Sequence, residues 1–462
     1  MSTYLQEALE RFTKDSPISV MARAVMEHAM SAEDLDAVFS ENAKRQYTRE
    51  LLFSTVVDVL GAVVMRSQKS VNAAYQAKVD QMAVSVTSLY NKLSRTEPAV
   101  CQALLRHEAG RLQAIIEVMG GHMPPLLPGY RLRIVDGNHL AATERRLAPL
   151  RGSVAGPLPG QSLVVLDPSL MLATDVIVCE DGHAQERSLT EDLLALVHPL
   201  DAILADRNFC TARLLWGIAQ REAFFIIRQH STNVAWDTNG KRTKLGRIAT
   251  GTVWEQRVML HVGGHELPAR RVTLHLDKPT RDGDTELHIL TNLPAANVPG
   301  LKIAQLYAKR WAVETLFQEL TVYLKCEVNT LGYPKAALLA FCVALTAYNV
   351  LSTVRAALRA EFGVEKIENE VSDYYLADEI SGIYRGMMVA IPPEGWAPFL
   401  GLSAPALADK LRILARQIHL PRFKKHRRGP KKPVPPRTRF KEHTHVSTAQ
   451  LLANDGGRDE PP

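Results

Sequence analysis

The chain has 462 residues, which is too long for one simple hydrophobic core, so two or three domains are expected. Hydrophobic residues make up 46% and charged residues 23%, as in ordinary soluble globular proteins, and the five scattered cysteines form no Cys-X-X-Cys pair. This cysteine usage argues against a disulfide scaffold or a zinc knuckle and suits a reducing cytoplasm.

The net charge of +6 has a local origin. The stretch from Arg422 to Lys441 holds ten Lys or Arg and no Asp or Glu, so the remainder of the chain is acidic overall. A proline-containing basic run commonly follows the phosphates of a nucleic acid, but it can equally be a solvated tail that aids solubility. The candidate DNA-binding residues in this run are Lys424, Lys425, Arg427 and Arg428.

Residues 1–125 are predicted to form a helical N-terminal DNA-binding domain. The first residues, MSTYLQEALERFTKDS, mix charges early and have no apolar core of a signal peptide. Ser31 and Asp34 are spaced like a capping box that opens a helix, and residues 49–66 are apolar at helical spacing. Residues 74–95 are compatible with a DNA-binding helix-turn-helix that turns near Met82–Val84, although any two packed helices give a similar pattern.

From residue 126 to 230 the pattern changes to mixed α/β. Apolar and alternating segments predict strands over residues 130–140, 162–167, 171–181, 201–209 and 223–228. Helices are predicted over 188–200, with Ser188 as the N-cap, and over 211–222. The order is therefore three strands, helix, strand, helix, strand.

Three further regions complete the predicted organisation. Residues 231–300 are predicted to be a β-rich insertion, with strands over 251–262, 269–277 and 285–293. Residues 301–375 hold an amphipathic helix over 303–324 and a long apolar helix, and 376–462 form a C-terminal region with the basic tail. Residues 336–354 lack any charge and reach membrane-spanning length, but their five Thr, Tyr, Asn and Ser residues favour a buried core helix.

Three acidic residues occupy positions where they could bind a metal ion together. Asp136 and Asp206 end two predicted strands, and if these strands are neighbours the two carboxylates emerge at the same sheet edge. Glu314 lies on the helix over 303–324, which could pack across that edge. Converging carboxylates repel one another unless a cation binds between them, and carboxylate oxygens without His or thiolate suit Mg²⁺ and phosphoryl transfer. Taken singly, these acids are also compatible with a turn, an ion pair and an exposed helix position.

The helix over 303–324 carries a second group of polar residues. Tyr307, Arg310 and Glu314 share one face at helical spacing, so Arg310 could hold a phosphate beside the acid. Trp311 could stack on a displaced base. The alternative is an ordinary Arg310–Glu314 surface pair with Trp311 as core filler.

In this order, the segments "DGNHL", "ADRNF" and "YAKRWAVETLF" resemble the DDE transposases of bacterial insertion sequences, in particular the insertion-sequence-four group. The segment "ILTNL" and the tail leading into "HVSTAQLL" are also similar to that family. The resemblance covers roughly residues 50 to 450. It implies a ribonuclease-H-like catalytic domain with a β-rich insertion, which acts on DNA with Mg²⁺, or Mn²⁺ as a substitute.

The resemblance also implies roles for individual residues. Asp136, Asp206 and Glu314 would be the catalytic metal ligands, and Tyr307, Arg310 and Trp311 would contact DNA. Arg207 and Arg228 are similar to basic positions of the family. The family signature places Lys at position 321, where this chain has Thr321, and Lys325 one turn further along nearly the same face is a candidate replacement.

The expected function is that of a bacterial, cytoplasmic and nucleoid-associated DNA transposase. It would cleave the ends of its element and join the 3′ hydroxyls to target DNA by two-metal-ion phosphoryl transfer, as a homodimer on terminal inverted repeats and without a membrane. The alternatives are a catalytically decayed or regulatory DNA-binding derivative and a stand-alone nuclease of the same fold.

Overall fold

The computed structural model describes residues 3–46, 50–152, 155–280, 283–426 and 446–454. Arg427 and Arg428, two of the predicted DNA-binding residues, lie outside these ranges.

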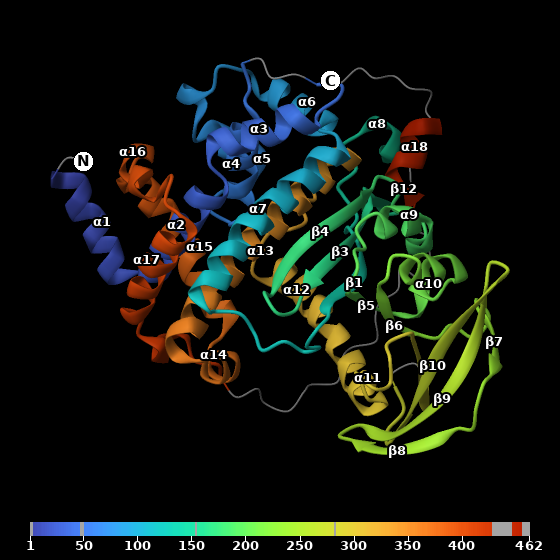
Figure 1. Ribbon diagram of the computed structural model, residues 1–462. Helices are drawn as coiled ribbons and strands as arrows, with labels where there is room; N and C mark the ends of the chain where they lie inside the picture. Colours follow the sequence, from blue (N-terminus) through green and yellow to red (C-terminus); the bar gives the residue numbers. More distant parts are fainter. Residues whose placement is uncertain (1–2, 47–49, 153–154, 281–282, 427–445, 455–462) are drawn as a thin grey trace.

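A mixed sheet forms the centre of the molecule (Figure 1). Five of its strands run in the order β4-β3-β1-β5-β6, in which β1, β3 and β4 are antiparallel and β1, β5 and β6 are parallel. This order and these directions are those of a ribonuclease-H-like sheet, so the predicted fold class is confirmed. The strands are β1 (Arg131–His139), β3 (Gln161–Asp167), β4 (Leu172–Cys179), β5 (Asp201–Ala205) and β6 (Phe224–Arg228).

The β-rich insertion extends this same sheet. Strand β11 pairs antiparallel with β6, and the order continues through β10 and β9 to β7, with β8 also paired to β9, which makes ten strands in all. The predicted strands are present, whereas the short β7 and β8 were missed because they lack a clear alternating pattern. The insertion strands are β7 (Ala235–Thr238), β8 (Thr243–Ile248), β9 (Gly251–Val262), β10 (His265–Leu276) and β11 (Glu286–Thr291).

The pleat of the strands separates two hydrophobic cores. Ile134 and Leu204 point into the larger core, which they share with the N-terminal and C-terminal helices. Val135 and Ile203 point into a smaller core on the opposite face. Two short helices cover that smaller core, α9 (Thr190–Leu194) and α10 (Ala212–Ala219).

The N-terminal region is helical as predicted. Ser31 caps α3 by accepting a hydrogen bond from the backbone N–H of Asp34 at 3.1 Å, which confirms the predicted capping box start. The predicted turn near Met82–Val84 lies directly before α6. The helices are α1 (Thr3–Asp15), α2 (Pro17–Ala29), α3 (Ala32–Asn42), α4 (Phe53–Val64), α5 (Val71–Gln76), the 3₁₀ turn Val79–Gln81, α6 (Val86–Arg95) and α7 (Pro98–Met119).

The long apolar segment is the central helix of the larger core. Helix α13 (Pro334–Phe362) packs against α7 and β4. Within the described residues it is the one helix long and apolar enough to cross a membrane, and 94% of its most apolar window is buried inside the protein. The amide of Asn349 lies on this helix and binds both backbone groups of Ala173 on β4, at 2.8 and 2.9 Å.

The C-terminal region adds further helices to the same core and ends beside the sheet. Strand β12 (Val446–Ser447) pairs with β2 (Pro157–Leu158), which brings this C-terminal segment beside the loop between β1 and β3. The remaining elements are α8 (Ala148–Arg151), α14 (Val364–Glu370), α15 (Asp373–Ala390), α16 (Pro393–Trp396), the 3₁₀ turns Ala397–Phe399 and Leu420–Phe423, α17 (Ala404–Arg416) and α18 (Thr448–Asn454).

Two predicted helices differ from the structure. The helix predicted over 188–200 is a 3₁₀ turn (Glu186–Leu189) followed by the short α9, and Ser188 is no N-cap because its hydroxyl donates to Gln185 O at 2.7 Å. Pro199 disfavours helical backbone before it, which helps to end this segment early. The helix predicted over 303–324 is α11 (Gly300–Tyr307), a 3₁₀ turn (Ala308–Arg310) and α12 (Trp311–Val322).

Candidate active site

The two aspartates predicted to meet are placed at one edge of the sheet by strand register. In the parallel pair of β1 and β5, Ile134 lies opposite Leu204. Continuing this register by two residues places Asp136 at the level of Asp206. Each acid lies two positions after a residue of the larger core, Ile134 or Leu204, so both emerge on the face of the sheet that α12 covers.

Helix α12 brings Glu314 to the same place. Its residues Val313, Leu316 and Leu320 are buried in the larger core, and the helix contacts β1. This packing fixes the start of α12 beside the carboxyl end of β1. The structure therefore places Glu314 near Asp136, with Arg310 between the two carboxylates, while the charge of Asp206 acts on Asp136.

Arg310 joins two of these acids directly. Its Nη1 donates to Asp136 Oδ2 at 2.9 Å and its Nη2 to Glu314 Oε1 at 2.6 Å. Arg310 and Asp136 each have only 14% of the side chain exposed, whereas Glu314 is 50% exposed. The Nε of Arg310 is buried without a hydrogen-bond partner. The arginine thus offsets part of the negative charge of the site and keeps one donor available for a further acceptor.

The electrostatics of Asp136 reflect this arrangement. Burial raises its pKa to about 7, Arg310 opposes the rise, and the neighbouring charges of Asp206 and Glu186 add to it. A carboxylate that is desolvated beside other carboxylates is stabilised by a nearby positive charge. The site therefore favours a bound cation.

Glu186 is a fourth acid of this site, which the sequence did not indicate. It lies in the 3₁₀ turn before α9, and its Oε2 accepts from Asn208 Nδ2 at 3.1 Å. Burial raises its pKa, and the charge of Asp206 adds to the rise. The backbone N–H of Asn208 in turn donates to Asp206 Oδ1 at 2.7 Å. No motif or spacing marks Glu186, because its place depends on how the loop after β4 folds back over the sheet.

The carboxylate oxygens of these acids suit a divalent cation, but in this structure they are not spaced closely enough to form a metal site. Within the described part of the chain, no three His, Cys, Asp or Glu side chains come close enough to hold a metal ion. Arg310 lies where the carboxylates of Asp136 and Glu314 would converge. Hard carboxylate oxygens without thiolate or imidazole ligands fit Mg²⁺ or Mn²⁺ once the guanidinium shifts.

Three further predicted residues border the acids. Burial raises the pKa of Tyr307 to about 12, against the effect of the nearby charges of Arg310 and Arg228. Arg228 is paired with Asp284 at 2.7 Å, so its guanidinium already has a carboxylate partner. Arg207 is exposed beside Asp206, and its charge helps to lower the pKa of Asp284, after the larger effects of Arg228.

The remaining predicted DNA-binding residues lie elsewhere. Because α12 ends at Val322, Lys325 does not continue its face; its Nζ donates to the backbone oxygen of Lys69 at 2.6 Å. Trp311 opens α12, and its side chain lies outside the described atoms. Lys424 is exposed, whereas Lys425 donates to the backbone oxygen of Glu368 at 2.6 Å.

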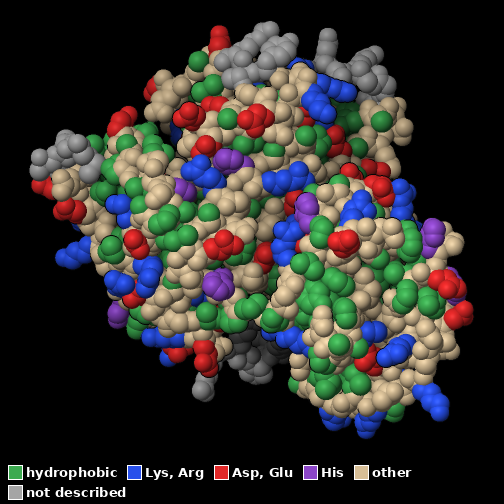
Figure 2. All heavy atoms as spheres, in the orientation of Figure 1, with side chains coloured by type: hydrophobic (Ala, Val, Ile, Leu, Met, Phe, Trp, Pro, Cys, Tyr) green, Lys and Arg blue, Asp and Glu red, His purple; other side chains and the backbone are tan. Residues whose placement is uncertain are grey.

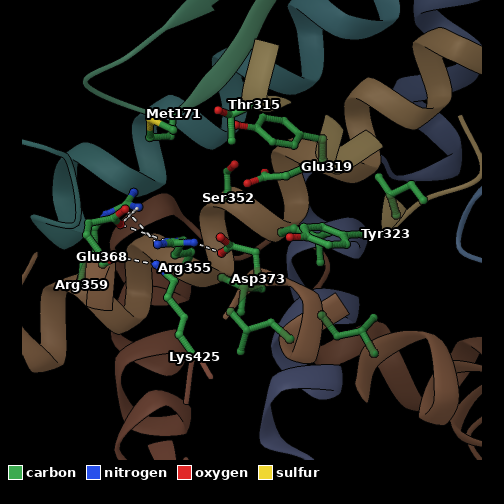
Figure 3. A pocket seen from close by; sticks show the side chains of 16 residues that line it. Met171, Thr315, Glu319, Tyr323, Ser352, Arg355, Arg359, Glu368, Asp373 and Lys425 are labelled. Atoms are coloured by element: carbon green, nitrogen blue, oxygen red, sulfur yellow. Dashed lines mark hydrogen bonds and ion pairs between the residues drawn. The ribbon is translucent and has the colours of Figure 1, made fainter. Parts of the chain in front are cut away.

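Residues of α12, α13 and α15 line a pocket that contains several charged side chains (Figure 3). Glu319 of α12 faces it together with a charged network in which Arg355 is paired with both Glu368 and Asp373. Lys425, at the start of the basic run, also lines this pocket. The helix that carries Glu314 therefore touches an ionic network that reaches the C-terminal region.

Charges are mixed on the visible surface. Figure 2 shows basic and acidic side chains interspersed over most of this face, with several basic side chains at the free edge of the β-rich insertion. On this face the described residues form no continuous field of one sign.

Comparison with known proteins gives a match for the region that holds the acids. Residues 128–350 match a protein-family model described as the transposase DDE domain, and this range contains Asp136, Asp206 and Glu314. A cryo-EM structure titled as the piggyBac transposase synaptic complex with hairpin DNA is similar with a TM-score of 0.37 and 13% identity, over 89% of this chain and 84% of that chain. No curated protein matches the chain. Residues 128–350 are therefore similar to the transposase DDE domain.

Proposed function

We propose that this chain is a DNA transposase that cleaves the ends of its own element and joins the freed 3′ hydroxyls to target DNA. The observation that supports the proposal is that Arg310 binds both Asp136 and Glu314 at the edge of the sheet where strand register also brings Asp206, inside the region that matches the transposase DDE domain. The signature of Tyr307, Arg310 and Glu314 supports membership of the insertion-sequence-four group.

Asp136, Asp206 and Glu314 are the residues that would hold Mg²⁺ or Mn²⁺. When bound, a pair of such ions supplies Lewis-acid stabilisation of the attacking and leaving oxygens of a phosphodiester. In the first step a water oxygen attacks phosphorus and the bond to the 3′ oxygen breaks, which leaves a 3′ hydroxyl and a 5′ phosphate. In the second step that 3′ hydroxyl attacks a target phosphorus and displaces the target's own 3′ oxygen.

The residues of the chain would orient the DNA around this chemistry. Arg310 has a buried Nε without a partner and two further donors that now bind Asp136 and Glu314. A phosphate oxygen is a matching acceptor for this guanidinium, and its binding would free both carboxylates for the cation. Tyr307 lies close enough to Arg310 for the two side chains to interact.

The partners and location follow from this function. We propose that the N-terminal helices, the basic run with Lys424 and the exposed Arg207 contact the terminal inverted repeats or target DNA. We further propose a homodimer that holds two ends together, in a bacterial cytoplasm and associated with the nucleoid. The burial of α13 supports a protein that works without a membrane.

Cleavage of the DNA that flanks the gene tests the proposal. Purified protein is incubated with a labelled end fragment and Mg²⁺, beside Asp206→Asn and Glu314→Gln. Cleavage at the element ends that both substitutions abolish, together with joined products, is the expected result. Cleavage without joining would indicate a nuclease instead. Binding without cleavage, even with Mn²⁺, would indicate a decayed or regulatory protein, an alternative that Thr321 at the signature Lys position leaves open.

A further inference from the structure

Glu186 connects the two strand ends that carry the aspartates. On one side its carboxylate accepts from the side chain of Asn208, whose backbone N–H binds Asp206. On the other side it packs directly against the α carbon of Gly137, the residue after Asp136. One carboxylate thus touches both the turn after β5 and the end of β1.

A side chain at position 137 would fit only if the Glu186 carboxylate moved away. A β carbon at position 137 would overlap the carboxylate of Glu186, and it would meet no other group as closely. The backbone of Gly137 does not have a positive φ, so glycine is not needed there for its conformation. Its lack of a side chain instead allows the Glu186 carboxylate to approach closely. The sequence feature "DG" at 136–137, which usually indicates a turn, lies within a strand here.

We propose that Glu186 is a positioning residue that fixes the separation of Asp136 and Asp206 by linking Gly137 to Asn208. This inference rests on the proposed function, because the separation matters only if both aspartates hold the same cation. Carboxylates that ligate a metal are usually oriented by such outer hydrogen bonds, and losing them typically weakens metal binding about 10-fold to 100-fold.

Substitutions separate the role of position from that of charge. Glu186→Gln keeps an oxygen that can accept from Asn208, whereas Glu186→Ala removes both the contact and the charge. Gly137→Ala leaves every charge in place but pushes the Glu186 carboxylate away. Glu191→Ala is the matched control, because Glu191 lies nearby on α9, is exposed, and pairs only with Arg213 among the described ion pairs.

The measurement is Mn²⁺ binding by the full chain, followed by electron paramagnetic resonance, with thermal unfolding without metal as a check of folding. We expect Glu186→Ala and Gly137→Ala to weaken Mn²⁺ binding at least about 10-fold, and Glu186→Gln and Glu191→Ala to stay within about threefold of the wild type. The double variant Glu186→Ala/Gly137→Ala should be no weaker than Glu186→Ala alone, because both changes break the same link.

The outcomes distinguish the inference from the function. If Asp206→Asn loses Mn²⁺ binding while Glu186→Ala binds as the wild type does, the positioning role is overturned and the function stands. If Glu186→Gln is as weak as Glu186→Ala, the charge and not the position is what Glu186 supplies, and the proposal is also overturned. If Asp206→Asn binds Mn²⁺ like the wild type, both the metal site and this inference fall.

Discussion

Arg310 and Asp136 form a half-buried ion pair between residues 174 positions apart in the chain, with Nη1 and Oδ2 separated by 2.9 Å. The same guanidinium also binds Glu314, so it holds the end of β1 and the start of α12 together. In this state the arginine supplies the positive charge that a cation would supply. Arg310 therefore occupies oxygens of Asp136 and Glu314 until its guanidinium binds another acceptor.

Replacing Arg310 should destabilise the metal-free protein. Arg310→Ala leaves Asp136 buried beside Asp206 and Glu186 without its counter-charge, and we expect a loss of about 2 to 4 kcal/mol in the free energy of unfolding. Urea unfolding in the presence of EDTA measures this loss. Saturating Mg²⁺ should recover more stability in the variant than in the wild type, because the competing guanidinium is gone.

The exposed pair of Arg213 and Glu191 provides the control for this experiment. Arg213→Ala should change stability by less than about 1 kcal/mol and should not alter the effect of Mg²⁺. Equal losses in the two arginine variants would contradict the view that Arg310 is the internal counter-charge of the acids.

Asn349 should be essential for docking the apolar helix α13 on the sheet. Its amide satisfies both backbone groups of Ala173 on β4 and donates to the buried carboxylate of Glu108 at 2.8 Å. Asn349→Leu keeps the size but leaves these groups unpaired, so we expect a loss of about 3 kcal/mol or more in urea unfolding. Gln113→Leu on the exposed face of α7 should stay within about 0.5 kcal/mol. A similar small effect at Asn349 would refute this role.

The sequence was informative wherever a local pattern determines structure. The strands that carry Asp136 and Asp206 have apolar runs, and the spacing of Tyr307, Arg310 and Glu314 placed them together. The end of α12 at Val322 could not be predicted, because the chain beyond it binds the N-terminal helices, where the backbone N–H of Lys325 donates to Val64 O at 2.9 Å. No local pattern indicated the 3₁₀ turn at Ala308–Arg310. This is why Lys325 was expected on the face of Glu314 but lies against Lys69.

Glu186 shows the other limit of sequence reasoning. Its partners Gly137 and Asn208 are 49 and 22 positions away in the numbering, and no periodicity connects them. Only the folding of the loop after β4 brings this carboxylate beside the aspartates. No sequence pattern indicated the ion pair of Asp284, in the insertion, with Arg228 at the end of β6 either.

Thr321 and Lys325 should differ in their effect on DNA binding. Thr321 is exposed near the end of α12, with its hydroxyl bound to the backbone of Phe317 at 2.9 Å, so a lysine fits there. Thr321→Lys should tighten binding of an element end and steepen its salt dependence by about one charge. Lys325→Ala should leave binding nearly unchanged, because its ammonium serves Lys69. Fluorescence anisotropy at several salt concentrations measures both, and a larger effect of Lys325→Ala would assign the phosphate contact to Lys325.

Glu319 should make the stability of the protein depend on pH. Burial raises its pKa to about 7, the charge of Arg355 opposes the rise, that of Glu368 adds to it, and that of Lys425 opposes it. Since the folded pKa lies above that of the unfolded chain, the native state holds the proton more tightly. The resulting stability is complete below about pH 4.5 and is lost as the pH rises through about 7.

Glu319→Gln should remove this dependence. Without an ionisable group at position 319, the variant should gain about 2 kcal/mol over the wild type at pH 8 and little at pH 4.5, as measured by urea unfolding at both values. Glu365, which is exposed at the start of α14, gives the control Glu365→Gln, which should follow the wild type at both pH values. An equal gain at pH 4.5 and pH 8 would show that Glu319 acts through packing. A gain in stability that grows with pH requires a carboxylate that titrates in the pocket lined by α12.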